Sequence, residues 1–204
     1  MKITKFILPA LLFVATPVLA GDKEDIIKVH KEYKDAVISQ DSEMIIKTQS
    51  KAYPEMIEKN RKLALTASKE ELLKKNMFEI MTALKFRAIM NKKELEEFDI
   101  AQLSDVFAKS DANMAEVLQK QTLGEIELNG EKATAALIMD GNAIPGINLN
   151  FIEENGEWVI DVQASMDIAL EAMGDQDYTA EQYVQMMKFQ LKDKATDALW
   201  ELPK

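Results

Sequence analysis

The stretch that decides the fold is residues 124–162, which read GEIELNGEKATAALIMDGNAIPGINLNFIEENGEWVIDV. Polar and apolar residues alternate through much of it, as a strand with one buried face requires. Asn129-Gly130 and Asn155-Gly156 are typical of type I′ hairpin turns, because both central residues of that turn have positive φ. The stretch predicts a meander of four antiparallel strands, with a longer loop over residues 140–146 between the second and third strands.

The sequence on either side of this stretch favours helices. No glycine occurs between Asp22 and Leu123, and none follows Gly174. Glycine marks turns and caps rather than helix interiors, so long glycine-free stretches are compatible with helices. We therefore predict an α+β protein with a helical N-terminal block, a curved four-stranded antiparallel meander and C-terminal helices.

Capping boxes indicate where several of these helices begin. In such a box, a side chain at the N-cap and a Glu or Gln three residues later each bind a free amide of the other residue. Ser68–Glu71, Asn91–Glu94 and Thr179–Gln182 have this spacing. The first is expected to open a single helix that continues through Leu84, and the last to open a terminal helix whose apolar stripe includes Ala195 and which has Trp200 near its end.

The N-terminus has the pattern of an export signal. Lys2 and Lys5 precede the apolar stretch 6–14, and Ala20 supplies the small residue of a cleavage site. We interpret residues 1–20 as a signal peptide and residues 21–204 as one domain. Together with the absence of cysteine, this predicts a periplasmic protein, with release from the cell as the lesser alternative.

The composition excludes several classes of protein. The chain has 25 Lys and Arg against 35 Asp and Glu, a formal net charge of −10. Nucleic acids and anionic lipid heads bind clusters of Lys and Arg, so neither is an expected partner, and no membrane association is expected after signal cleavage. Zero cysteine excludes disulfides, Cys-ligated zinc and a thiol nucleophile.

No cofactor or metal is predicted. The sequence lacks the G-x-S-x-G pattern of serine hydrolases and the glycine-rich patterns that cradle phosphates. A calcium loop starting at Asp175 would need glycine at its sixth position and glutamate at its twelfth, where Ala180 and Met186 stand. The methionines favour core filling over copper binding, since Met77 and Met81 lie within a stripe of Leu and Ile.

Two segments of the meander resemble the NTF2-like superfamily, in particular its small secreted bacterial members. These are Asn129-Gly130-Glu131-Lys132-Ala133 and the run from Phe151 through Trp158 to Asp161, which look like the closing hairpins of that family. The first helix, ending near Ser39-Gln40-Asp41, also looks like theirs. The resemblance implies a curved sheet wrapped around helices to form a cone with an apolar mouth.

The family includes isomerases, dehydratases, epoxide hydrolases and many members without catalysis, so the fold alone does not assign a function. This chain departs from the family pattern in its long helical N-terminal block and in the two helices after the last strand. Those helices are expected either to plug the cone or to build a surface for a partner.

The sequence yields two sets of candidate site residues. A ligand in the concavity would contact Tyr33 and the sheet residues Leu137, Leu149, Phe151 and Trp158. A catalytic alternative pairs His30, the only imidazole, with a carboxylate such as Asp161 as a general base. The favoured interpretation of His30 is that it pads the apolar stripe of the first helix.

We therefore expect a non-enzymatic periplasmic binding protein that engages a basic partner protein or a small apolar ligand. An inhibitor or immunity protein against a cationic toxin and an envelope accessory factor fit equally well, since a negative field speeds association with a basic partner. One alternative is a lyase or isomerase using His30 and a carboxylate, and another is a helical envelope chaperone. The sequence leaves the oligomeric state open, a dimer included.

Overall fold

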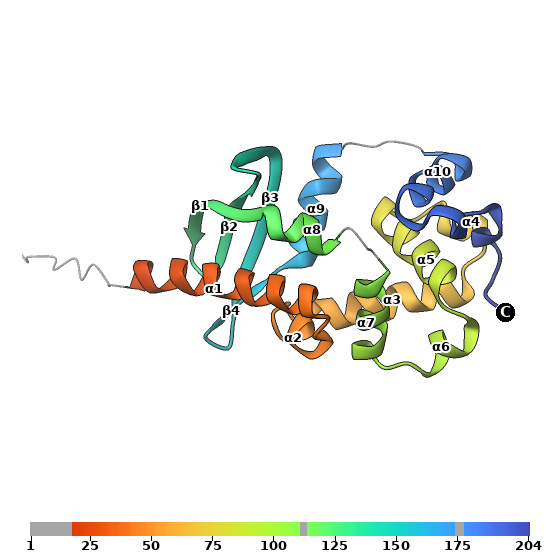
Figure 1. The fold of residues 1–204 in the computed structure, drawn as a ribbon, viewed down its shortest axis with the longest axis horizontal. Coiled ribbons are helices and arrows are strands. Elements are labelled where there is room, and N and C mark those ends of the chain that lie inside the picture. The colour runs from red at the N-terminus through yellow and green to blue at the C-terminus, as the bar shows by residue number, and fades with distance from the viewer. Residues whose placement is uncertain (1–17, 111–113, 174–177) are drawn as a thin grey trace, which may run out of the picture.

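A computed structural model describes residues 18–110, 114–173 and 178–204 of the chain (Figure 1). No helix within these ranges combines the length and the apolarity needed to cross a bilayer. The elements follow one another as α1 (Val18–Ser39), α2 (Ser42–Lys47), α3 (Ala52–Thr66), α4 (Lys69–Leu72), α5 (Met77–Ile89), α6 (Lys92–Glu97), α7 (Ile100–Lys109), α8 (Met114–Lys120), β1 (Gln121–Asn129), β2 (Lys132–Met139), β3 (Asn142–Glu154), β4 (Glu157–Ile160), α9 (Val162–Met173), α10 (Ala180–Leu191), and the short 3₁₀ helices η1 (Lys192–Lys194) and η2 (Asp197–Trp200).

The predicted α+β class and the antiparallel meander are confirmed. The four strands form one curled sheet in the order β1-β2-β3-β4, with helices before and after it. Asn155 and Gly156 both have positive φ and form the predicted turn between β3 and β4. The predicted type I′ turn with Asn129 and Gly130 at its centre is wrong. Asn129 pairs with Lys132, so the central residues are Gly130 and Glu131, and of these only Gly130 has positive φ.

The predicted loop over residues 140–146 is wrong. Asp140 and Gly141 both have positive φ and make a tight two-residue turn, after which β3 starts at once at Asn142. Pro145 lies inside β3, where the pairing with β2 shifts register between Ala136 and Ile138. Proline has no amide hydrogen to donate, so a break in the ladder is where a strand tolerates it.

Helices cover the sheet on both faces. Ile26 and Val29 of α1 form a core with Phe151, Trp158 and their neighbours on one face. Side chains alternate along a strand, so Asn150 points to the opposite face. There its side-chain amide donates to the Ser165 hydroxyl of α9 at 3.5 Å, and its backbone N–H donates to the same hydroxyl at 3.0 Å. We call α1, β1–β4 and α9 the sheet lobe.

The two edges of the sheet are protected in different ways. On the β4 side, the segment Thr48–Ser50 adds a short parallel pairing, in which the N–H of Ser50 donates to the carbonyl of Ile160 at 2.9 Å. On the β1 side, a register shift between Leu123 and Ile126 coincides with the exposed side chain of Glu125. Bulges and charges are the means by which proteins discourage edge-to-edge association of strands.

Most of the other helices form a second unit. We call it the helical lobe and define it as α3–α7, α10, η1 and η2. It lies opposite the sheet lobe in Figure 1 and has its own core, in which Leu84, Phe86 and Met187 are fully buried. A smaller cluster, including Val37, Ile45 and Leu118, connects the two lobes through α1, α2 and α8.

The capping boxes at Ser68, Asn91 and Thr179 are confirmed. The single helix predicted from Ser68 through Leu84 is wrong, because α4 ends at Leu72 and α5 begins at Met77. A further capping box, Asn76–Glu79, opens α5. Its two reciprocal hydrogen bonds satisfy free amides of the new first turn, which makes a restart at this point favourable.

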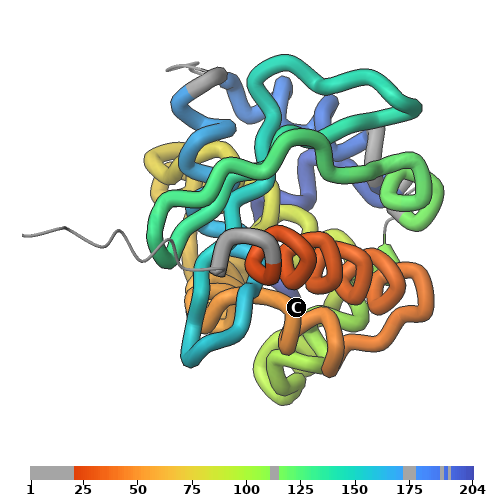
Figure 2. Tube along the Cα trace, turned by 90° about the vertical axis from the view of Figure 1, so that its left-hand side faces the viewer, coloured from red at the N-terminus to blue at the C-terminus, as the bar shows by residue number. Residues whose placement is uncertain are grey.

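The C-terminal chain returns to the helical lobe and leaves the concave face of the sheet to α1 (Figure 2). The prediction of one terminal helix with Trp200 near its end is wrong. α10 ends at Leu191, Lys192 has a φ of 52°, and Trp200 lies in η2. Arg87 of α5 fixes this segment. Its guanidinium donates to the carbonyls of Ala64 at 2.8 Å, Ala67 at 2.5 Å and Leu63 at 3.2 Å in α3 and its C-terminus, and to those of Leu199 and Trp200 at 3.3 Å in η2.

Candidate functional site

A groove lies where the two lobes meet. α3 and α5 of the helical lobe form one wall, and α9 of the sheet lobe forms the other; Figure 1 labels the three helices. The groove has a volume of about 280 Å³. Clefts between structural units are common positions for small-molecule sites, and this volume suits a small ligand.

Four large apolar side chains line this interlobe groove. Met56 comes from α3, Phe78 from α5, and Met166 and Leu170 from α9. All four are half-buried, so each keeps surface that a ligand can cover. Met166 and Leu170 lie four residues apart and therefore share one face of α9. The groove thus presents an apolar surface contributed by three helices.

The charged residues of the groove are mostly acidic. Glu55, Glu79 and Asp167 line it together with a single basic residue, Lys59. The ammonium of Lys59 lies 2.5 Å from a carboxylate oxygen of Glu79, whose side chain is only 13% exposed. Glu79 also closes the capping box of α5 with Asn76. The lysine is thereby neutralised, and the carboxylates of Glu55 and Asp167 leave the groove with negative charge.

Asn60 is the buried polar residue of the groove. It is only 3% exposed, and its side-chain oxygen has no hydrogen-bond partner. An unpaired polar atom that is buried in this way lowers the stability of the fold by about 1–3 kcal/mol. Among the described residues, His30, Gln49, Ser50 and Trp200 also have a buried unpaired side-chain atom, and Asn60 is the one of the five that lines the groove.

The side chains predicted to line a concavity in the sheet lie in its core instead. Phe151 is 1% exposed, and Trp158 is also buried; both pack against α1. Leu149 is partly buried beside them. The indole N–H of Trp158 donates to the carboxylate of Asp22 at 3.2 Å. Leu137 is buried on β2. The face of the sheet that was expected to hold a ligand is occupied by α1.

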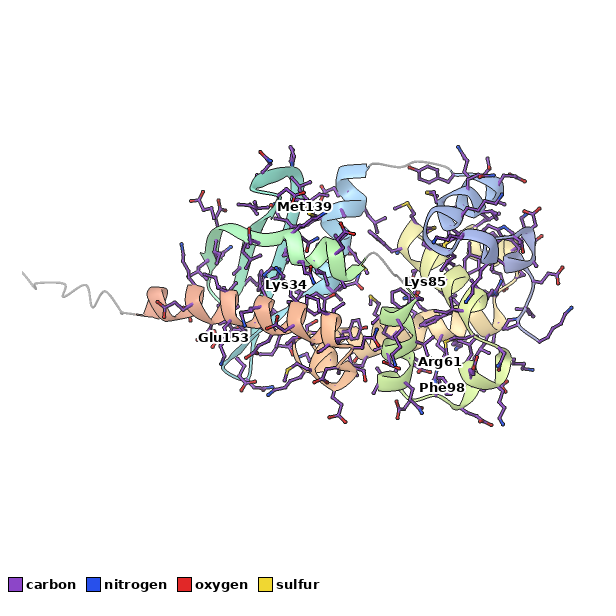
Figure 3. The ribbon with its side chains drawn as sticks, viewed as in Figure 1. Lys34, Arg61, Lys85, Phe98, Met139 and Glu153 are labelled. Atoms are coloured by element: carbon purple, nitrogen blue, oxygen red, sulfur yellow. The ribbon has the colours of Figure 1, made fainter. Side chains whose placement is uncertain are left out.

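His30 and Tyr33 lie on α1, and Tyr33 packs against both the sheet core and the cluster that includes Val37. His30 is 5% exposed, and burial together with the positive charge of Lys34 lowers its pKa to about 4. Figure 3 shows Lys34 on α1, where its ammonium donates to the carbonyl of Gln121 at the start of β1. Burial and the neighbouring Tyr53 raise the pKa of Tyr33 to about 12. Both side chains are neutral near pH 7.

Asp161 has a structural role at the start of α9. Its carboxylate accepts a hydrogen bond from the N–H of Ala164 at 3.0 Å and caps the first turn. No hydrogen bond joins Asp161 to His30, and Nε2 of His30 has no partner. A histidine with a pKa near 4 is a weak base at neutral pH. Among the described residues, no three His, Asp or Glu side chains are arranged to hold a metal ion.

The interlobe groove was not predicted from the sequence. Its residues come from three separate segments, of which α3 and α9 lie more than ninety positions apart, so no local motif contains them. One signal was present. Asn60 follows Ile57 by three residues and precedes Ala64 by four, which places an amide in the buried stripe of α3. A polar residue in such a stripe can indicate a site.

No model of a protein family matches the chain, and neither the curated proteins nor the solved structures that were searched give a match.

Proposed function

We propose that this chain is a non-enzymatic binding protein that holds a small, partly apolar ligand in the interlobe groove. The observation that carries this proposal is the combination of a groove in which three helices contribute large apolar side chains with the buried, unpaired side-chain oxygen of Asn60. A folded protein retains an unpaired buried polar group at a cost in stability, and a function that uses the group accounts for its presence.

Two observations support binding rather than catalysis. The groove contains carboxylates and amides but no histidine, and the one histidine of the chain is buried on α1. The carboxylate predicted to activate it, that of Asp161, is engaged in capping α9. The lyase or isomerase alternative needs these two groups to act as a pair.

The proposal includes a place in the cell and a relationship for the sheet. We infer export through the signal segment 1–20 and a periplasmic location, on the strength of the N-terminal sequence pattern. We also infer that the curled antiparallel sheet is NTF2-like, a relationship supported by its four-stranded order and by the long first helix packed on one face. In this chain, α1 fills that face and the ligand site lies outside it.

The function is tested by blocking the groove. Thr82 lines the groove on α5, and Thr82→Trp would fill it with an indole. Thr66 is an exposed threonine near the end of α3 that lines a different hollow, so Thr66→Trp is the matched control. Binding of three eight-carbon probes, 1-octanol, n-octylamine and octanoate, is measured by ligand-observed NMR on the mature protein.

At least one probe is expected to bind the unmodified protein and the Thr66→Trp variant but not the Thr82→Trp variant. Circular dichroism and urea unfolding check that both variants are folded. Equal binding by all three proteins, or binding of no probe to any of them, would overturn the groove as the functional site.

A further inference from the structure

The charged groups of the groove are mostly hydrogen-bond acceptors, whereas its uncharged amides and the Thr82 hydroxyl can donate as well as accept. Ionised carboxylates accept hydrogen bonds and donate none, and Glu55, Glu79 and Asp167 contribute three of them. The only cationic donor, Lys59, is bound to Glu79. Asp167 accepts one hydrogen bond, from the amide of Gln163 at 2.8 Å, and each carboxylate oxygen retains further acceptor capacity.

Asn60 adds an acceptor that is independent of these acidic residues. It lies on the buried stripe of α3, whereas Glu55 and Asp167 are exposed. The oxygen itself is buried, and a half-turn about the last side-chain torsion, which has broad minima in asparagine, would be needed to present it to a ligand. The groove therefore has negative charge near its rim and an unpaired acceptor at a buried position.

We propose that the ligand is a free primary amine with a short apolar chain, bound as its ammonium ion, an inference that rests on the proposed function. An ammonium group has three donors and no acceptor, which complements the carboxylates of Glu55 and Asp167 and the side-chain oxygen of Asn60. The apolar chain covers Met56, Phe78, Met166 and Leu170, which removes apolar surface from water on both sides. The net charge of −10 also attracts a cation toward the protein as a whole.

The charge of the head group is tested with the three eight-carbon probes, which share one apolar chain. We expect n-octylamine to bind about tenfold more tightly than 1-octanol, and octanoate to bind most weakly, because an ionic hydrogen bond is worth more than a neutral one. Dissociation constants are measured by calorimetry or NMR titration at pH 7 and low salt, where screening is least.

Two variants assign this preference to named residues. Glu55→Gln keeps the size of the side chain and removes its charge, and we expect about a fivefold loss of n-octylamine affinity with little change for 1-octanol. Asn60→Leu removes the buried acceptor, and we expect about a tenfold loss for n-octylamine. Glu70→Gln is the control, because Glu70 is an exposed acid on α4 that does not line the groove.

The outcomes separate this inference from the proposed function. If 1-octanol or octanoate binds in the groove as tightly as n-octylamine, the ammonium ligand is overturned while the groove remains a binding site. If no probe binds, both proposals fail. A short peptide bearing one lysine that binds more tightly than n-octylamine would overturn the choice of a free amine, and unchanged affinity in the Asn60→Leu variant would remove Asn60 from the site.

Discussion

The two lobes reach stable packing by different means. In the helical lobe, consecutive helices begin at capping boxes, and a core including Leu84, Phe86 and Met187 forms from helices close in sequence together with the returning C-terminus. In the sheet lobe, Phe151 and Trp158 are buried only because α1, more than a hundred residues earlier, packs across their strands. The helical lobe thus depends more on local structure, and the sheet lobe depends on distant contacts.

This difference explains where the candidate site lies. Each lobe closes its own core, and the junction between α9 and the α3–α5 pair is left as a groove with polar and charged residues. A surface that neither core requires is free to carry groups that do not contribute to stability. The buried, unpaired oxygen of Asn60 lies at this junction.

The largest expected effect tests whether the cores of the two lobes unfold independently. Phe151→Ala and Phe86→Ala each remove a fully buried ring, and each should lower the free energy of unfolding by about 4 kcal/mol. We expect Phe151→Ala to reduce amide protection mainly in the sheet lobe and Phe86→Ala mainly in the helical lobe, as measured by hydrogen exchange. A uniform loss of protection across both lobes would show that they form one cooperative unit.

The next effect concerns the closure of the helical lobe. Arg87→Met leaves the carbonyls of α3 and η2 without their shared donor and should lower the free energy of unfolding by roughly 3 kcal/mol. Arg61→Met is the control. Arg61 donates to one carbonyl, that of Phe98 at 2.7 Å (Figure 3 labels both residues), and pairs with the exposed Glu58, so about 1 kcal/mol is expected. Equal losses in urea unfolding would contradict the role given to Arg87.

A smaller effect depends on pH and is specific to the sheet lobe. The pKa of His30 is about 4 in the folded protein and 6.5 in the unfolded chain, so the unfolded chain binds more protons between these values. The contribution of neutral His30 to the free energy of unfolding is complete above pH 6.5 and is lost as the pH falls toward 4. The loss is about 2 kcal/mol at pH 5.

The measurement compares urea unfolding of the unmodified protein and the His30→Gln variant at pH 7.5 and pH 5. The change in the free energy of unfolding between the two pH values is compared in the two proteins, and the difference is the contribution of His30 alone. Lys34→Met removes the positive charge that helps to lower the pKa of His30, and it should reduce the loss at pH 5. A pH dependence that is the same in all three proteins would disprove the assignment.

The smallest effect has the opposite sign. Asn60→Leu replaces an unpaired buried amide by an apolar side chain of similar size and should raise the free energy of unfolding by about 1 kcal/mol. Asn60→Asp places a charge at the same buried position and should be destabilising. Thermal unfolding of both variants is the measurement. A destabilised Asn60→Leu variant would mean that the amide contributes to the fold.

Local features of the sequence determined the helix starts and most of the sheet. The Ser68–Glu71 and Thr179–Gln182 boxes and the Asn155-Gly156 turn were predictable, because each satisfies its hydrogen bonds or its positive φ within a few residues. The Asp140-Gly141 turn follows the same rule, so the prediction of a longer loop over residues 140–146, which contains Pro145, is wrong.

Only the tertiary structure decided which surfaces became core and which became groove. The alternation of Leu149 and Phe151 predicts a buried face but does not say whether a helix or a ligand covers it, and the structure assigns that face to α1. Leu170 and Phe78 line one groove because the chain brings α9 back beside α5. Burial is a property of contacts between distant segments, so the sequence pattern fixes the faces of each element while their partners depend on how the whole chain packs.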